Sequence, residues 1–271
     1  MIYYTYQPRL PLSKFIEFLW FWKEDSLSEL RSCILPIGSM ELVIDLNEDN
    51  IPLFELYSQV QCGKTKGVRI CGAHSQGFII TRNQSCSVLG VHFKPGGSTA
   101  FLSIPAGELH NQIISLEELW QESARELRER LLSKSTIKER FQTLEQFLFN
   151  VMQPPDHHRA IDFALREFER FPACPVRTVI NQVGLSNRYF NTLFRDRVGL
   201  TPKLYCRVRR FQQVLRHIEG KKHIDWVDVA FTYGYFDQTH LIHDFRTFAN
   251  CTPTEYLAQR GFLPFHLEIS N

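Results

Sequence analysis

Histidine and aspartate side chains crowd the segment GYFDQTHLIHDFRTF, residues 234–248. His240 and His243 are three residues apart, and Asp237 and Asp244 flank them. One turn of a helix would bring such side chains together, as a metal site on a helix requires. The same pattern is also typical of a polar helix surface. Whether the segment is a metal site or a polar helix surface therefore depends on the secondary structure that positions these side chains.

A helical projection of this segment separates its polar residues. Leu241, Phe245 and Phe248 fall on one face, which we expect to be buried. Asp237 falls at the start, where it can cap the helix, and Asp244 leans toward the edge of the core. The opposite face and its flanks carry Thr239, His243, Arg246, Ile242 and His240. No sulfur or carboxylate joins the two histidines on that outer side, so the projection favours a polar surface over a metal site.

The segment is also the second copy of an internal repeat. Residues 186–205 align with residues 237–256. The matched positions are Phe190 with Leu241, Phe194 with Phe245, Arg195 with Arg246, Pro202 with Pro253, and Tyr205 with Tyr256. A glycine, Gly184 or Gly234, precedes each copy and follows a short helical stretch. A helix, a glycine turn and a capped second helix form a helix-turn-helix unit, so two such units are predicted.

The second helix of each unit is predicted to display a polar ridge. In the first copy Arg188, Thr192 and Arg195 fall opposite the apolar residues, as Thr239, His243 and Arg246 do in the second. Such a ridge fits the major groove of DNA, where side chains near the helix N-terminus reach base edges.

Charge along the chain supports a polyanionic partner. The whole chain has a net charge of +2. Residues 183–222 contain ten Lys/Arg against Asp196 and Glu219, a net of +8. Residues 223–260 have a net of −3, from two arginines against five acidic residues. We therefore expect the first unit and the helix after it to contribute most of the salt-dependent affinity for DNA.

The remaining chain divides at NVMQPPDHHR, residues 150–159, where two prolines interrupt a helical pattern. Four strand-like runs precede the division, at residues 32–37, 40–46, 77–81 and 87–93, and two amphipathic helices follow them at residues 115–132 and 136–151. The prediction is an α+β N-terminal domain, an antiparallel sheet followed by helices, over residues 1–150. An all-α domain with two helix-turn-helix units joined by a long helix is predicted over residues 156–262.

Several functional classes lack their signatures. No run of 18 apolar residues or N-terminal signal pattern is present, so we expect no membrane association. The seven cysteines include no Cys-x-x-Cys pair, which indicates reduced thiols in a cytoplasmic protein. Binding to DNA would make that protein nucleoid-associated. No nucleophile elbow, phosphate loop or His-Glu-x-x-His motif is present. We expect neither an enzyme nor a cofactor.

Together these motifs resemble the AraC/XylS family of bacterial transcription regulators over about 100 residues, 160–260. The segments that carry the resemblance are GLSNRYFNTLFRDRVGLTP (184–202), the linker helix YCRVRRFQQVL (205–215) and VDVAFTYGYFDQTHLIHDFRTFANCTP (227–253). More weakly, LPIGSMELVIDL (35–46) and VLGVHFKPGGSTAFLSIPAGEL (88–109) resemble a sensor domain found in some of these regulators.

The resemblance implies sequence-specific binding to double-stranded DNA at a promoter or operator. It assigns Arg188, Asn191, Thr192 and Arg195 to the first reading helix, Gln238, Thr239, His240, His243 and Arg246 to the second, and Lys203, Tyr205, Arg207 and Arg210 to supporting contacts. Among these, Arg195, Lys203, Tyr205 and Arg246 are expected at phosphates. Thr192 and His243 stand where the family often has Arg, so His243 is predicted to make a weaker, pH-sensitive contact.

For the N-terminal domain the resemblance implies a small-molecule effector, with a homodimer and RNA polymerase as further partners. The alternative is a DNA-binding regulator whose N-terminal domain serves only protein–protein interaction or dimerisation. A minor alternative is metal sensing through Cys62, Cys71, His74 and Cys86. Trp20, Phe21, Trp22 and His92 are candidates for an effector pocket, although core packing is the simpler role for each.

Overall fold

A computed structural model describes residues 1–25, 30–56, 58, 60–82, 85–154, 158–261 and 266–269. Its strands are β1 (Ile2–Tyr6), β2 (Ile16–Asp25), β3 (Leu30–Ile34), β4 (Glu41–Asp45), β5 (Asn50–Phe54), β6 (Gln61–Lys66), β7 (Val68–Cys71), β8 (Phe78–Arg82), β9 (Ser85–Phe93), β10 (Ile113–Ser115) and β11 (His266–Ile269). Its short 3-10 helices are η1 (Leu12–Lys14), η2 (Gly97–Ala100) and η3 (Ala106–Leu109). Its α-helices are α1 (Glu117–Trp120), α2 (Glu122–Leu132), α3 (Ile137–Val151), α4 (Arg159–Arg170), α5 (Val176–Val183), α6 (Asn187–Val198), α7 (Pro202–His217), α8 (Trp226–Thr232), α9 (Gln238–Ala249) and α10 (Pro253–Gln259).

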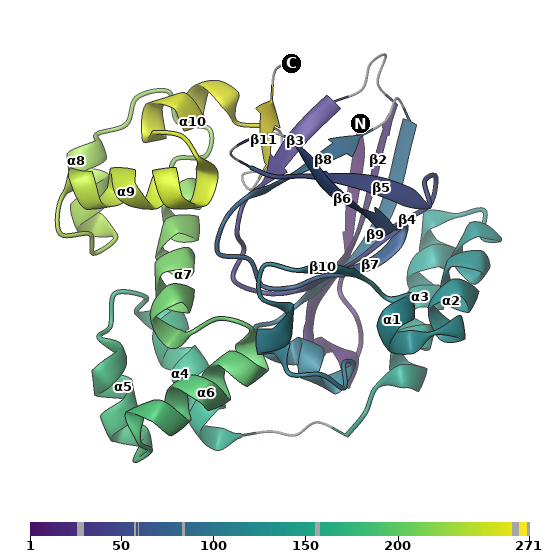
Figure 1. Cartoon of the computed structure of the whole chain (residues 1–271), viewed down its shortest axis with the longest axis horizontal. Helices are drawn as coiled ribbons and strands as arrows, with labels where there is room; N and C mark the ends of the chain where they lie inside the picture. The colour runs from purple at the N-terminus through teal and green to yellow at the C-terminus, as the bar shows by residue number, and fades with distance from the viewer. Residues whose placement is uncertain are drawn as a thin grey trace.

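Two antiparallel sheets form the N-terminal part, and the helices lie on either side of them (Figure 1). One sheet has the strand order β1-β2-β9-β4-β7-β10, and the other has β11-β3-β8-β5-β6. Helices α1 to α3 lie beside the sheets, on the side opposite α7. The predicted class, an antiparallel sheet domain followed by helices and a helical region with two helix-turn-helix units, is confirmed. None of the described helices is long and apolar enough to cross a membrane.

Alternation along β2 places its side chains on two faces of the larger sheet. Leu19 and Phe21 are buried in the core, whereas Phe18 and Trp20 point to the opposite face. Leu19 is paired with Val91 of β9 in the register, which extends the core row across the sheet. Strand β2 therefore contributes alternate side chains to the core and to the opposite face of the larger sheet.

The helix-turn-helix units begin and end as their sequences predict. Ser186 and Asp237 cap α6 and α9 by accepting hydrogen bonds from Tyr189 N and His240 N, at 3.3 Å and 2.7 Å. Gly184 and Gly234 have φ angles of 69° and 70°, a conformation that side chains other than glycine rarely adopt. Thr201 caps α7, whose first residue is proline.

Three features of the fold were not predicted. The helix expected over residues 115–132 is broken at Gln121, where φ is 50°, into α1 and α2. Strands β1, β2, β5, β6, β7 and β10 add to the four expected runs. Strand β11 lies beyond the predicted helical domain and pairs with β3 in the smaller sheet (Figure 1).

The helical region is packed against the sheets at several points. Gln212 Nε2 of α7 donates to Pro36 O at 3.1 Å, and Gly77 N donates to Phe248 O of α9 at 3.0 Å. A Cβ at Gly199, after α6, would lie 2.9 Å from the Cβ of Ala73, so only glycine fits this close approach. These contacts tie both helix-turn-helix units to the N-terminal part.

Candidate nucleic-acid interface

The outer face of α6 carries the residues expected there. Arg188, Asn191, Thr192 and Arg195 are all exposed, because Phe190 on the other face is buried completely. Asn191 Nδ2 donates to Asn187 O of the preceding turn at 2.7 Å, so its amide is held along the helix. The predicted outward direction is confirmed, and contact with DNA stays a prediction.

The outer face of α9 is smaller and less basic. Thr239, His243 and Arg246 are exposed, whereas Gln238 and His240 are half-buried. The His240 ring packs edge-on against Tyr235, with ring centroids 5.2 Å apart. Three of the five residues predicted for this reading helix are therefore fully available at the surface.

Arg195 occupies a position between the predicted interface and the N-terminal part. Its guanidinium lies 4.0 Å from Asp196, and a Cβ at Gly107 of η3 would come within 3.0 Å of Arg195 Nε. Burial lowers the pKa of the neighbouring His110 imidazole, and the positive charge of Arg195 lowers it further. Arg195, which is predicted to contact a DNA phosphate, therefore lies where α6 packs against η3.

Arg207 and Arg210 of α7 hold a buried carboxylate and do not face outward. Arg207 Nη2 donates to Asp244 Oδ1 at 2.6 Å, and Arg210 Nη2 lies 3.7 Å from Asp244 Oδ2. Arg210 also donates to Gly234 O at 3.1 Å and lies over the Tyr235 ring. Asp244 is 0% exposed. The prediction that both arginines contact DNA is corrected, because a buried charge needs these partners.

Tyr205 is also misassigned as a phosphate contact. It is only 1% exposed and packs against Phe194 and Phe168, with ring centroids 5.6 Å and 6.5 Å away. Burial raises the pKa of its hydroxyl, which fixes the neutral form. Tyr256, the matching residue of the second copy, is equally buried. The repeated tyrosine is therefore a core residue, and Lys203 remains the exposed residue at this end of α7.

The two units are held at opposite ends of α7 (Figure 1). Its 16 residues give a length of about 24 Å at 1.5 Å per residue. Helix α7 therefore holds the two reading helices apart, and a spacing that matches successive major-groove segments of DNA stays a prediction.

The residues proposed for metal sensing are not brought together. Cys62 is exposed on β6, whereas Cys71 and Cys86 are buried on β7 and β9. His74 is buried against Phe78, with ring centroids 4.5 Å apart. Among the residues that the structure describes, no group of three or more His, Cys, Asp or Glu could hold a metal ion. The minor alternative, metal sensing through Cys62, Cys71, His74 and Cys86, is therefore contradicted by the positions of these residues.

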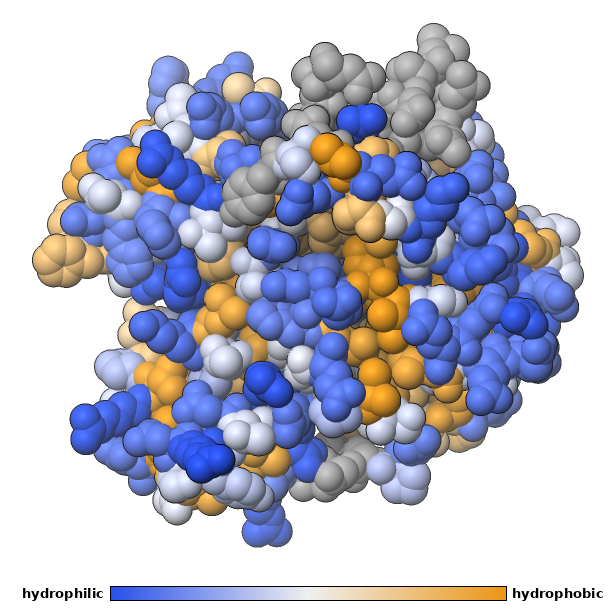
Figure 2. All heavy atoms as spheres, in the orientation of Figure 1, coloured by the Kyte–Doolittle hydropathy of each residue, from blue (hydrophilic) through white to orange (hydrophobic). Residues whose placement is uncertain are grey.

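A cavity of about 260 Å³ lies between the two sheets. The strand register builds its floor in rows across β2, β9, β4 and β7: Phe18, His92, Glu41 and Cys71, then Trp20, Gly90, Val43 and Arg69, then Trp22, Val88 and Asp45. Figure 2 shows apolar residues gathered over the strands between polar flanks. Three of the four pocket candidates, Trp20, Trp22 and His92, line this cavity, whereas Phe21 belongs to the core.

Two elements outside the sheet floor complete the cavity. Arg209, Gln212 and Arg216 reach it from α7, and His266 reaches it from β11, where its ring stacks on Trp22. His92 is held by two hydrogen-bond partners, Glu41 Oε1 at 2.9 Å and Ser39 Oγ at 3.2 Å. Sequence patterns gave no signal for Arg69, which lies within a short, fully buried strand.

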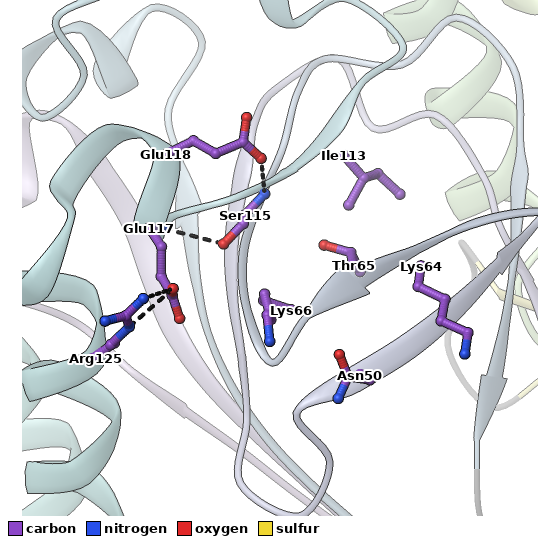
Figure 3. A pocket seen from close by; sticks show the side chains of 9 residues that line it. All are labelled: Asn50, Lys64, Thr65, Lys66, Ile113, Ser115, Glu117, Glu118 and Arg125. Atoms are coloured by element: carbon purple, nitrogen blue, oxygen red, sulfur yellow. Dashed lines mark hydrogen bonds and ion pairs between the residues drawn. The ribbon is translucent and has the colours of Figure 1, made fainter.

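A second hollow is open and polar (Figure 3). In it Arg125 donates to Glu117 at 2.9 Å and to Glu122 at 2.8 Å, and Ser115 N donates to Glu118. Lys66 of β6 forms an ion pair with Asp49 at 3.6 Å. Arg125, Glu117 and Lys66 have partners and the hollow is open to solvent, so it shows no feature of a built site.

Comparisons with known proteins find matches in two separate parts of the chain. A family described as a helix-turn-helix domain matches residues 179–259, and a domain of unknown function matches residues 4–115. The probable transcription factor PqrA of Proteus vulgaris is 26% identical over 98 residues, 36% of this chain and 79% of PqrA.

Solved structures of ToxT from Vibrio cholerae are similar over most of the chain. One at 1.65 Å resolution is 11% identical with a TM-score of 0.49, and covers 95% of this chain and 98% of ToxT. Another, described as bound to an unsaturated fatty acid, is 12% identical with a TM-score of 0.46, and covers 88% and 93%.

Proposed function

We propose that the chain is an AraC-type DNA-binding transcription regulator and that a small-molecule effector in its N-terminal cavity controls how it binds DNA. One observation carries the proposal. Helix α7 lines the cavity with Arg209 and Gln212, and the same helix joins the two helix-turn-helix units. A ligand in the cavity would therefore touch the element that sets the spacing of the reading helices.

Contacts on both sides of α7 support this coupling. Toward the sheets, Gln212 is 1% exposed and donates to Pro36 O. Toward the second unit, Arg207 and Arg210 hold Asp244 of α9. A ligand that binds differently to two positions of α7 shifts the balance between them, and with it the orientation of the second unit.

For DNA we propose two classes of contact. Arg188, Thr192, Gln238 and Thr239 lie on the first two turns of their helices and are proposed to read base edges, with Asn191, His240 and His243 beside them. Arg195, Lys203 and Arg246 are proposed to position the protein on phosphates. We also propose that residues 1–150 and 156–262 act as the sensing and DNA-binding domains.

The DNA-binding proposal is tested by measuring affinity for a DNA fragment from upstream of the neighbouring genes. The double variant Arg188→Ala with Arg246→Ala should weaken binding by about 100-fold, since each residue contributes a base or phosphate contact of 1–3 kcal/mol. Arg125→Ala, on exposed α2, is the matched control and should bind like wild type. Unchanged affinity in the double variant would overturn the assignment of this face.

The effector proposal is tested by thermal shift of the full chain with a panel of small metabolites. One chemical class should raise the melting temperature in a concentration-dependent manner. It should also change the affinity for the same DNA fragment. If no class stabilises the protein, the N-terminal domain serves protein–protein interaction or dimerisation instead.

A further inference from the structure

We propose that the cavity between the sheets is built for a small organic anion: a carboxylate, or a group of like charge, on an aromatic or apolar body. This rests on the proposed effector function and adds the chemical class of the ligand. The argument comes from hydrogen-bond donors that the cavity leaves without acceptors.

Arg69 is the central residue of this inference. It is 5% exposed, lies in the middle row of the floor and lines the cavity. Its Nη1 has no hydrogen-bond partner, and its charge acts on the nearby Asp45 carboxyl without an ion pair between them among the described residues. A buried guanidinium with an unmatched N–H is costly unless an anion joins it.

Trp20 provides a second donor in the same row. Its Nε1 is buried and has no acceptor, and it lines the cavity. The indole lies against Gly90, where an added Cβ would come within 2.5 Å of Nε1, so glycine makes room for the ring. Two unmatched donors in one row require a ligand with acceptor atoms.

The two acidic residues of the floor, Glu41 and Asp45, already have hydrogen-bond partners. Glu41 accepts from or pairs with His92 at 2.9 Å. Asp45 Oδ1 accepts hydrogen bonds from Asn47 N at 2.9 Å and from Glu48 N at 2.8 Å. A cationic ligand would have to compete with these partners, whereas an anion would meet donors that lack them.

Two arginines of α7 add positive charge at the side of the cavity. Arg209 lies 3.7 Å from Glu169, and Arg216 is two helical turns further along α7. Burial and the positive charge of Arg209 both lower the pKa of the Arg216 guanidinium. The carboxylates of Glu17, Glu169 and Glu219 offset part of this charge, and an anion between the floor and α7 would offset more of it.

The rest of the wall selects an apolar body. Tyr3, Phe18, Trp22 and Phe78 surround the space, and aliphatic residues of the smaller sheet close it. The volume of about 260 Å³ lies just below the range of ~300–1,000 Å³ that is usual for ligand pockets. A molecule with one ring or a short chain fits this size.

Three probes of similar shape and different charge test the inference: 3-phenylpropionate, its neutral amide and 3-phenylpropylamine. Binding to the full chain is followed by tryptophan fluorescence, because Trp20 and Trp22 line the cavity. The carboxylate should bind at least tenfold more tightly than either other probe. Equal or weaker binding of the carboxylate, or no binding by it, would overturn the proposal.

The variant Arg69→Met tests the assigned residue, since methionine keeps an apolar side chain and removes the donors. The preference for the carboxylate should fall to within about twofold, and Arg125→Met should leave it unchanged. A tenfold preference that survives in Arg69→Met would contradict the role of Arg69. If that variant does not fold, Trp20→Phe should still reduce carboxylate binding about threefold with little effect on the amide.

DNA affinity of the same preparation separates this inference from the proposed function. Loss of the charge preference with normal DNA binding removes the anion proposal alone. Carboxylate binding that leaves DNA affinity unchanged supports the anion site and removes its regulatory role.

Discussion

The two helix-turn-helix units arise from one repeat but are attached to the molecule by different chemistry. Asp244 of the second unit is 0% exposed and is held by Arg207 and Arg210. In the repeat alignment its counterpart in the first unit is Leu193, which is half-buried. Both units pack on α7 through buried aromatic rings, and the second unit adds a buried ion pair where the first has an apolar side chain.

This difference shows how a repeated element can keep its outer face while its attachment diverges. The first unit has a close approach in place of the ion pair, because Gly199 at the end of α6 packs on Ala73. Apolar packing resists displacement in proportion to area, whereas a buried charge pair tolerates little change in geometry. We expect the second unit to respond more sharply to a shift of α7.

The units also differ in how much of their charge can reach DNA. The net of +8 over residues 183–222 includes Arg207, Arg209 and Arg210, which all have partners within the protein. The positive charge that residues 183–222 can offer to DNA phosphates is therefore smaller than their net charge of +8 suggests. It still exceeds that of the second half, whose net charge is −3.

The largest expected effect comes from removing the ion pair. Asp244→Asn should lower the free energy of unfolding by about 3 kcal/mol, because it leaves two partly buried arginines without their counter-charge. Urea denaturation measures the change. Asp228→Asn, an exposed carboxylate on α8, is the matched control and should cost less than about 0.5 kcal/mol. Similar costs for both variants would mean that the second unit is not fastened by charge.

Low pH should destabilise the packing between the first helix-turn-helix unit and the N-terminal part. His74 follows Ala73, on which Gly199 packs, and burial lowers the pKa of its imidazole to about 4. The unfolded chain, at about 6.5, takes up the proton first, so this contribution is present above pH 6.5 and is lost as the pH falls toward 4. Stability should drop by about 2 kcal/mol from pH 7 to pH 5. His74→Gln should flatten that slope in urea denaturation, and an unchanged slope would exclude His74 as its source.

Salt dependence compares the two units as DNA contacts. Arg195→Ala should weaken binding about tenfold and reduce the salt slope by about 0.9, the value of one phosphate contact. Arg246→Ala should reduce the slope less, since the Glu255 carboxylate lies near Arg246 and offsets part of its charge. Affinities measured between 50 mM and 200 mM salt give both slopes. A larger loss for Arg246→Ala would reverse the predicted order of the units.

The smallest expected effect concerns His243. His243 is exposed on α9, and a positively charged imidazole there would strengthen a contact with phosphate or guanine. Wild type should therefore bind DNA about threefold more tightly at pH 6 than His243→Ala, with a smaller difference at pH 8. Equal binding by the two proteins at both pH values would remove His243 from the interface.

The outer faces of α6 and α9 could be predicted because they depend on local signals. Glycine turns, capping side chains and helical periodicity fix which residues point outward. The errors concern residues whose burial depends on a distant partner. Tyr205 meets Phe168 of α4, and Arg207 meets Asp244 from 37 residues away. Neither pairing is visible in the spacing of one helix.

The N-terminal part was predicted less completely for a similar reason. Period-2 alternation separates Phe21 from Trp20 and Trp22 once β2 is known to be a strand. Arg69 lies in a four-residue strand whose neighbours are all buried, and only the register across β4 places it in the cavity floor. Short strands such as β10 carry too few residues for a pattern to emerge.

The pairing of β11 with β3 has a consequence for how the protein is made. More than two hundred residues separate β3 from the strand that covers its edge. At about 5–20 residues per second, a ribosome needs on the order of ten seconds or more to supply that strand. During this interval the edge of β3 can pair with another chain, which is a known route to aggregation. The yield of folded protein should therefore depend on the rate of its synthesis and on the local concentration of unfinished chains.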